Sequence, residues 1–196
     1  MDTPADTRPP AGDIDPAWFL DHFTELFEHT SYRLETLDYY DDPGERETYR
    51  EFREGKPVPR NQWWLDFIRQ ARRDGKVMAR VHVVSEPLSE YMKFEIAAYL
   101  ANGYAAGEDV RILPRPQAGE INGVPDYWLM DSRLAVLMSY DGGGVLTRVE
   151  AVTDPRTVAD CCRWRDVAMH RAIPLGDYTK RSLAHDDPRR AVPQGR

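Results

Sequence analysis

Side chains able to carry out chemistry gather where a predicted strand passes into a predicted helix. Arg80 lies on the strand, Ser85 and Glu86 lie in the turn, and Tyr91 and Glu95 follow on the helix. Residues four apart share one helix face, so Tyr91 and Glu95 can both point at an arginine. A carboxylate pair beside an arginine can bind a polar ligand or transfer protons. The alternative, which we favour, is a buried arginine-glutamate network that ties the helix to the sheet.

The following predicted elements bring more polar and aromatic side chains toward this junction. Glu108 and Arg111 belong to the next strand, and Trp128 and Asp131 belong to a later strand and its turn. Ligands of α/β proteins usually bind at the carboxyl ends of strands. Asp131 with Asp126 could bind a cation, although a turn-forming role is favoured. The candidate ligand-binding pocket therefore consists of Arg80, Ser85, Glu86, Tyr91, Glu95, Glu108, Arg111, Trp128 and Asp131.

Residue type and spacing argue against several kinds of catalytic site. Ser85 lacks the flanking glycines of a nucleophile elbow and a recognisable histidine base, so we expect it to cap the following helix. None of the five histidines has metal-binding HExxH spacing. The glycine turn from Asp141 to Gly144 joins two strands and opens no helix, so it is not a phosphate loop. The sequence therefore predicts no catalytic residue, no metal and no cofactor.

Two adjacent tryptophans form a second candidate site. Trp63 and Trp64 lie on one predicted helix, where neighbouring residues cannot both face inward, so one of them is expected to be partly exposed. An exposed tryptophan beside the KPVPR segment is a candidate contact for a protein partner. Packing in the core and stacking of a nucleic-acid base are the alternatives.

Composition limits the class of protein. The chain has 196 residues with five Trp and ten Tyr, enough for one core, and a net charge of −7 that disfavours direct binding of nucleic acid. No apolar run approaches the length of a membrane span, and the first residues are acidic and rich in proline, so we expect a cytoplasmic protein. Cys161 and Cys162 are adjacent in a helical pattern and are expected to be reduced.

Hydrophobic periodicity and capping residues predict an α+β fold with a mixed or antiparallel sheet of about five strands packed against helices. We expect a disordered tail over 1–13, a single domain over 14–178 and a disordered basic tail over 179–196. The predicted helices begin at Asp15-Pro16, Asp42-Pro43, Asn61, the SEP turn at 85–87 and Asp154-Pro155, and the predicted strands cover 32–37, 76–84, 109–114 and a three-stranded meander from 126 to 152.

Three segments resemble a family of actinobacterial proteins known as a domain of unknown function. They are RVHVVSEPLSEYMKFE, AAGEDVRILPR and DYWLMDSRLAVLMSYD, and the resemblance covers about 18–175. Members are often encoded near helix-turn-helix regulators, which implies a regulatory role. The order of elements is also similar to half of a phospholipase-D-like domain. That superfamily needs an HxK motif where this chain has Tyr127, Trp128 and Leu129, so the resemblance implies a degenerate copy.

Two functions follow as hypotheses. The first, which we favour at this point, is a non-catalytic regulatory protein that recognises a protein partner, such as a helix-turn-helix regulator, through exposed aromatic side chains. The second is a small-ligand-binding protein or enzyme built on the arginine, glutamate and tyrosine side chains of the candidate pocket. An open cleft at these side chains would support the second hypothesis, and a closed, fully paired network would oppose it.

Overall fold

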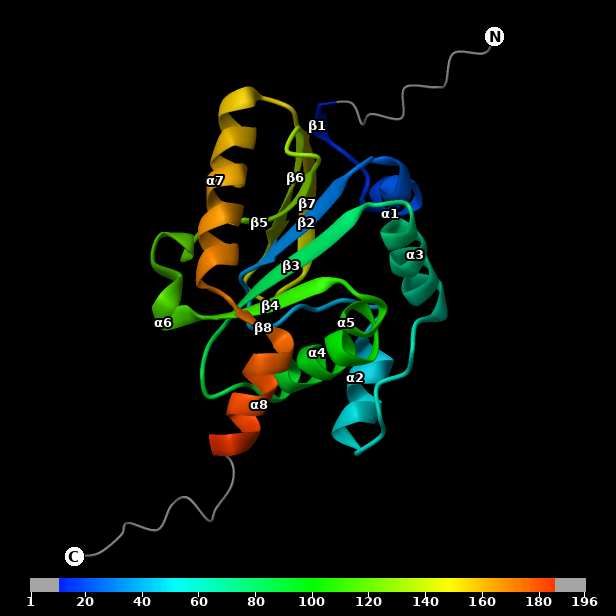
Figure 1. Ribbon diagram of the computed structural model, residues 1–196, viewed down its shortest axis with the longest axis vertical. Helices are drawn as coiled ribbons and strands as arrows, with labels where there is room; N and C mark the ends of the chain where they lie inside the picture. The colour runs from blue at the N-terminus through cyan, green and yellow to red at the C-terminus, as the bar shows by residue number, and fades with distance from the viewer. Residues whose placement is uncertain (1–10, 186–196) are drawn as a thin grey trace, which may run out of the picture.

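One sheet organises residues 11–185, the part of the chain that the computed structural model describes (Figure 1). Its strands are β1 (Gly12–Asp13), β2 (Thr30–Glu35), β3 (Val77–Val84), β4 (Asp109–Pro114), β5 (Asp126–Met130), β6 (Leu134–Tyr140), β7 (Leu146–Val152) and β8 (Ile173–Pro174). They lie in the order β1-β7-β6-β5-β2-β3-β4-β8. The three strands β2, β3 and β4 are parallel, and the other neighbours are antiparallel.

The predicted α+β class with a mixed sheet is confirmed. The described part of the chain has eight strands where about five were expected. The two strands without a predicted counterpart, β1 and β8, are edge strands of two residues, which are too short to leave an alternating pattern in the sequence. The three meander strands β5, β6 and β7 are antiparallel neighbours, as their short turns predicted.

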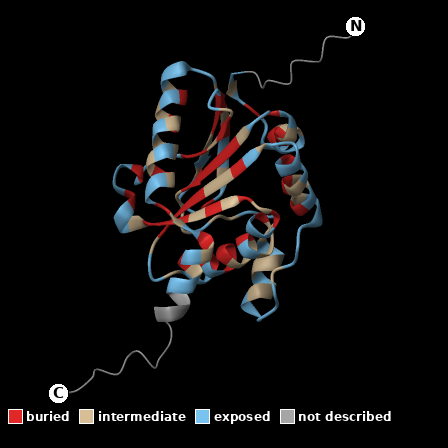
Figure 2. Ribbon diagram, in the orientation of Figure 1, coloured by how far each residue is buried: buried red, intermediate tan, exposed pale blue. Residues whose placement is uncertain are grey.

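Helices cover both faces of the sheet (Figures 1 and 2). One face packs against α7 (Pro155–Arg171) and against the short segments α6 (Arg115–Ala118) and η2 (Gly119–Ile121). The other face carries α1 (Pro16–His22), η1 (Phe23–Glu25), α2 (Arg46–Arg53), α3 (Gln62–Arg73), α4 (Glu90–Ala101), α5 (Gly103–Ala106) and α8 (Leu175–His185).

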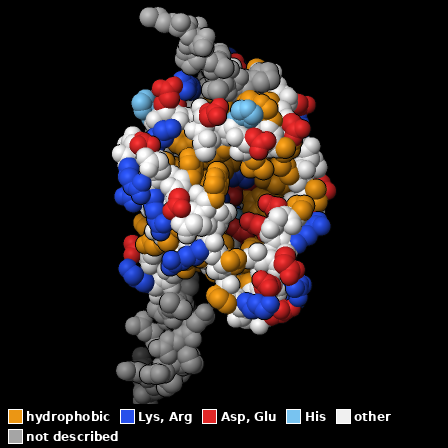
Figure 3. All heavy atoms as spheres, turned by 90° about the vertical axis from the view of Figure 1, so that its right-hand side faces the viewer, with side chains coloured by type: hydrophobic (Ala, Val, Ile, Leu, Met, Phe, Trp, Pro, Cys, Tyr) orange, Lys and Arg blue, Asp and Glu red, His pale blue; other side chains and the backbone are white. Residues whose placement is uncertain are grey.

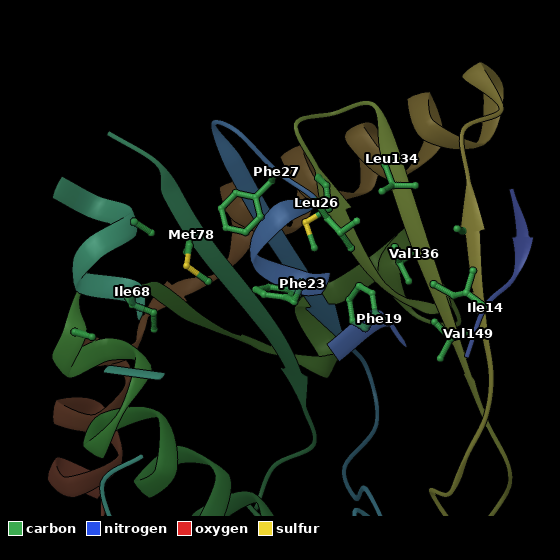
Figure 4. Packing of buried hydrophobic residues seen from close by; sticks show 14 of the residues in the cluster. Ile14, Phe19, Phe23, Leu26, Phe27, Ile68, Met78, Leu134, Val136 and Val149 are labelled. Carbon is green, nitrogen blue, oxygen red and sulfur yellow. The ribbon is translucent and has the colours of Figure 1, made fainter. Parts of the chain in front are cut away.

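The second face has two separate apolar clusters. Around α1, η1 and α3, the cluster contains Phe23, Ile68 and Met78, which Figure 4 shows packing together with neighbouring phenylalanines. Around α4 and α8, a different cluster contains Phe94 and Ile112. The strip of sheet between the two clusters carries polar side chains, and this strip becomes the floor of a cleft.

The register of the central strands sets which side chains meet on that strip. Arg33 of β2 lies directly beside Arg80 of β3 on one side and beside Trp128 of β5 on the other. Because side chains alternate along a strand, Glu35 shares this face, whereas Tyr32 and Leu34 belong to the core under α7.

Three predicted helix starts are confirmed by their capping bonds. The carboxylate of Asp15 accepts a hydrogen bond from the Ala17 amide at 2.8 Å, the Asn61 side chain accepts one from Trp64 at 3.1 Å, and Asp154 accepts one from Thr157 at 2.9 Å. These bonds satisfy amide groups that have no partner within the first turn of a helix.

Two predicted caps are wrong. The hydroxyl of Ser89, and not that of Ser85, accepts a hydrogen bond from the Met92 amide and caps α4. The signal at Asp42 does not open a helix, because its carboxylate accepts a hydrogen bond from the Gly44 amide in a turn, and α2 begins at Arg46. At Asp42 a hydrogen bond close in sequence competes with the cap, whereas the Ser85 hydroxyl is bonded by Asp38 and Arg115, which are distant in the sequence.

Regular structure extends past the expected domain boundaries at both ends. Residues 12–13 pair with β7, and α8 continues to His185, within the segment expected to be a tail. The rest of the predicted tails, 1–10 and 186–196, lies outside the described residues. None of the helices between residues 11 and 185 has the length and apolar character needed to cross a membrane.

Asp131 joins the β5–β6 turn to the loop that leads into β2. Its carboxylate accepts hydrogen bonds from the amides of Glu28 at 2.7 Å, His29 at 2.8 Å and Thr30 at 2.7 Å. Burial opposes ionisation of this carboxyl, but the three amide donors hold the pKa of Asp131 below its usual range. The predicted turn-forming role of Asp131 agrees with these contacts, and the residue lies away from the polar strip.

Asp131→Asn should lower the free energy of unfolding by about 1–3 kcal/mol, because an amide nitrogen cannot accept a hydrogen bond and leaves at least one donor unpaired. Urea denaturation at pH 7 measures this loss. Asp166→Asn, at an exposed position of α7, is the matched control and should change the free energy of unfolding by less than about 0.5 kcal/mol. Equal stability of the two variants would show that the three amide bonds contribute nothing.

Candidate functional site

A cleft of about 660 Å³ opens between the two apolar clusters on the second face of the sheet. Figure 3 shows the hollow from the side of α1 and α3, with hydrophobic side chains around it and acidic side chains inside it. The floor comes from β2, β3, β5 and β6, one wall comes from α1, η1 and α3, and the opposite wall comes from α4 and the loop after β2.

The floor is a buried network of two arginines and three carboxylates. Arg80 contacts Glu35 at 2.7 Å and Glu108 at 3.1 Å, and Arg33 contacts Glu35 at 3.4 Å and Asp126 at 3.4 Å. Burial opposes the charge of Glu35, but Arg80 and Arg33 lower its pKa to about 2. Since both guanidinium groups are already paired, the floor carries no free positive charge.

Aromatic side chains hold the two arginines in place. The guanidinium carbons of Arg33 and Arg80 lie 5.4 Å and 5.7 Å from the ring centre of Trp128, and Arg80 also lies 5.0 Å from that of Tyr99. The Tyr99 hydroxyl donates to Glu35 at 3.0 Å and is 2.8 Å from Nδ1 of the fully buried His82. These contacts pack and hydrogen-bond the floor side chains on several sides.

Besides the three carboxylates of the floor, a pair of carboxyl groups lies on the α4 side of the cleft. Glu95 is only 7% exposed and shares a hydrogen bond with Glu45 from the loop before α2. The Tyr91 hydroxyl donates to Glu45 at 3.2 Å. Burial and the charge of Glu45 raise the pKa of Glu95 to about 8, and burial with the charge of Asp42 raises the pKa of Glu45. The pair therefore retains a proton at neutral pH.

The opposite wall is aromatic. Phe23 packs edge-on against Trp128 with ring centres 4.8 Å apart, and Trp64 lies 5.8 Å from Phe23. Trp63 is 61% exposed at the rim of the cleft, and its ring centre lies 6.0 Å from that of Trp64. The prediction that one of the two adjacent tryptophans is exposed is therefore confirmed.

Five of the nine predicted pocket residues line this cleft, namely Arg80, Tyr91, Glu95, Glu108 and Trp128. Both predicted partner-contact residues, Trp63 and Trp64, line it as well. Tyr91 and Glu95 share a helix face, and Arg80 lies on the preceding strand. These three side chains line the same cleft, as expected.

Ser85 lies outside the cleft, at the carboxyl ends of the parallel strands. Its hydroxyl donates to Asp38 at 2.6 Å and accepts from Arg115 at 2.9 Å. Arg115 also contacts Asp38 at 3.1 Å. Burial opposes ionisation of Asp38, but its bonds with Ser85 and Arg115 lower its pKa. These three side chains satisfy one another and fasten the ends of the strands together.

The remaining predicted residues also lie elsewhere. The Glu86 carboxylate accepts from the Tyr178 hydroxyl of α8 at 2.8 Å. Arg111 is bound by Asp109 at 2.8 Å and donates to the Met169 carbonyl on the α7 side at 3.0 Å, so it does not meet Tyr91 or Glu95. Asp131 lies at the turn described above.

Sequence reasoning missed Arg33, Glu35, Glu45 and Tyr99. The sequence did contain a signal for Arg33 and Glu35. The segment SYRLE alternates polar and apolar residues, and a strand with that pattern places Arg33 and Glu35 on one face. Tyr99 follows Glu95 by four residues and so shares its helix face. No local pattern marks Glu45, which reaches the cleft from a loop.

A second, more open groove of about 740 Å³ follows α7 and the β5–β6 turn, lined in part by Arg133, Cys162 and Arg163. The cleft is the stronger candidate site because its floor is a buried arginine-carboxylate network, whereas Arg133 and Arg163 of the groove form exposed ion pairs. In the described region, no three His, Cys, Asp or Glu side chains are arranged to hold a metal ion. Cys161 and Cys162 are free thiols, and neither lines the cleft.

Comparison with known proteins agrees with the expected family. Residues 18–180 match the family described as a domain of unknown function (DUF6879), and the chain belongs to this family. No curated protein matches the chain. Among solved structures, the chain is similar to NucT from Helicobacter pylori with 12% sequence identity and a TM-score of 0.44, over 81% of this chain and 94% of that chain.

Glu95→Gln should remove a pH dependence of stability. The folded chain keeps a proton on Glu95 up to about pH 8, whereas the unfolded chain releases it near pH 4.5, so the free energy of unfolding falls as pH rises between these values. The variant should match the wild type near pH 4.5 and exceed it by about 2 kcal/mol or more at pH 8.5. Urea denaturation across this range measures the difference.

Glu90→Gln, at an exposed position of the same helix, is the matched control and should follow the wild type at every pH. If the Glu95→Gln curve also runs parallel to the wild type from pH 4.5 to 8.5, Glu95 does not hold a proton in the folded chain.

Proposed function

We propose that this protein binds a small organic molecule in the cleft between α3 and α4. The observation that carries the proposal is a 660 Å³ cleft with a polar floor and an aromatic wall. Clefts of this size and lining suit small ligands, with the apolar wall supplying affinity and a few fixed polar groups supplying orientation. A closed, fully paired network would have favoured a purely structural role. The arginine-glutamate network is paired, but it forms the floor of an open cleft, which supports ligand binding.

The side chains of the cleft support ligand binding better than catalysis. The Ser85 hydroxyl, which the sequence argued against as a nucleophile, lies outside the cleft, and so do the thiols of Cys161 and Cys162. Proton transfer by Glu95 stays an alternative within the same site. The predicted phospholipase-D-like ancestry also stays a prediction, with Tyr127 and Trp128 on the strand where that superfamily carries its catalytic histidine.

A variant that fills the cleft tests this proposal. Ala98→Phe places a large side chain on the α4 wall, and it should weaken binding of cleft ligands at least tenfold while the protein still unfolds cooperatively. Ligands would be found by thermal-shift screening of nucleosides, aromatic amino acids and aromatic amines, and dissociation constants would be measured by calorimetry.

Ala159→Phe makes the same change on exposed α7, over the second groove, and should leave binding unchanged. Compounds that lose affinity in Ala159→Phe but not in Ala98→Phe, or a screen without any binding compound, would refute the proposal.

A second candidate function is recognition of a protein partner, for which a helix-turn-helix regulator stays the predicted class. The observation that favours it is the rim of the cleft, where Leu20 is 68%, Trp63 61% and Val145 40% exposed. Large exposed apolar side chains that cluster around a concave surface are typical of contact sites. Tyr39, which is 44% exposed, lies beside Gly144 at the same rim.

Replacing the two most exposed rim residues, Leu20→Ser with Trp63→Ser, should abolish co-purification of a partner from native lysate. Val77→Ser removes an apolar side chain of similar exposure that does not line the cleft, and it should retain the partner. Mass spectrometry of the three eluates measures the outcome. A partner held equally by all three proteins, or by none, would contradict this candidate.

A further inference from the structure

The cleft has an excess of negative charge that its own arginines do not balance. Arg33 and Arg80 are the basic side chains among the described residues that line it. Both are bound by the floor carboxylates, since Arg80 pairs with Glu35 and Glu108, and Arg33 pairs with Glu35 and with Asp126 beside the cleft. The remaining carboxyl groups on the lining are those of Asp41, Asp42, Glu45 and Glu95. Asp41 is paired with Arg46, and the other three favour a positively charged occupant.

Glu95 and Glu45 are the acidic groups placed to receive such an occupant. Glu95 lines the cleft, is 7% exposed and forms no ion pair with any Lys or Arg that the structure describes. Among the described residues, the carboxyl group of Glu45 has Glu95 and the Tyr91 hydroxyl as its hydrogen-bond partners. A buried carboxyl without a basic partner must hold a proton or receive a cation, because an isolated buried charge is strongly unfavourable.

The aromatic wall supplies the second half of the argument. Phe19, Phe23, Trp63 and Trp64 face the cavity from the side opposite α4. These rings bury flat apolar groups, and their faces also attract cations. The cavity thus has a carboxyl pair on one side and ring surfaces on the other, with 660 Å³ between them. The aromatic wall is an observation independent of the acidic groups, and it favours a ligand with an apolar body.

We infer that the ligand of this cleft is an organic cation whose amine or amidine group binds between Glu45 and Glu95 while its flat apolar part lies against the aromatic wall. This inference rests on the proposed small-ligand function and names the ligand class. The same charges oppose phosphate and carboxylate ligands, since no guanidinium on the floor is free to pair with an anion.

Three probes of equal size and different charge test the inference. Benzamidine is a flat cation, benzamide is its neutral counterpart and benzoate is its anionic counterpart. Trp63, Trp64 and Trp128 line the cleft, so binding can be followed by quenching of tryptophan fluorescence and confirmed by calorimetry. Benzamidine should bind the full chain at least tenfold more tightly than benzamide or benzoate.

Glu95→Gln and Glu45→Gln should each weaken benzamidine binding at least tenfold and leave benzamide binding unchanged. Glu120→Gln, an exposed position paired with Arg163 on the α7 side, is the matched control and should bind benzamidine like the wild type. Glu45 is only partly buried, so its variant tests the site independently of Glu95→Gln.

Equal binding of benzamide or benzoate, no binding of any of the three probes, or unchanged benzamidine affinity in Glu45→Gln would overturn the inference. These results are distinguishable from failure of the proposed function. If neutral or anionic molecules from the screen bind and lose affinity in Ala98→Phe, the cleft binds ligands and only the cationic class is refuted. If no molecule from the screen is sensitive to Ala98→Phe, both proposals fail.

Discussion

Arg33 and Arg80 lie side by side on the parallel strands β2 and β3, and the packing of one face of the sheet depends on how their charges are balanced. Like charges directly opposite each other in a sheet repel, so the register is tolerable only because a carboxylate bridges them. Glu35 does this from the same strand as Arg33, with one oxygen toward each guanidinium. Removing one member of such a buried group typically costs about 3–5 kcal/mol, since the others are left uncompensated.

This network explains why the face carries two apolar clusters and not one. A helix laid across Arg33, Glu35 and Arg80 would have to bury the remaining polar atoms against apolar side chains, which is costly. The helices instead pack on either side, with α1, η1 and α3 over one part of the sheet and α4 and α8 over the other. The strip between them stays open, and Trp128 and Tyr99 cover only the faces of the guanidinium groups.

The same reasoning explains why the carboxyl ends of the parallel strands are not the open site, although α/β proteins commonly bind ligands there. At these ends Asp38, Ser85 and Arg115 bond one another, so few polar groups remain for a ligand. Arg111 is likewise held by Asp109 and a backbone carbonyl. The carboxyl groups that stay available are those of Glu45 and Glu95, which meet on the α4 side of the cleft.

Most of the local structure could be predicted from the amino-acid sequence, because capping residues and periodicity act within a few residues of each other. Asn61 and Asp154 open helices as predicted, the meander from Asp126 is antiparallel, and Tyr91 and Glu95 share a face four residues apart. Tertiary structure alone decided which elements became neighbours. It placed β2 in the centre of the sheet, so that Arg33 and Glu35 joined Arg80, and it carried Glu45 to Glu95 from a loop fifty residues earlier in the chain. These contacts depend on strand order and register, which are set by the combined packing of both faces and leave no signal near any one of the residues involved.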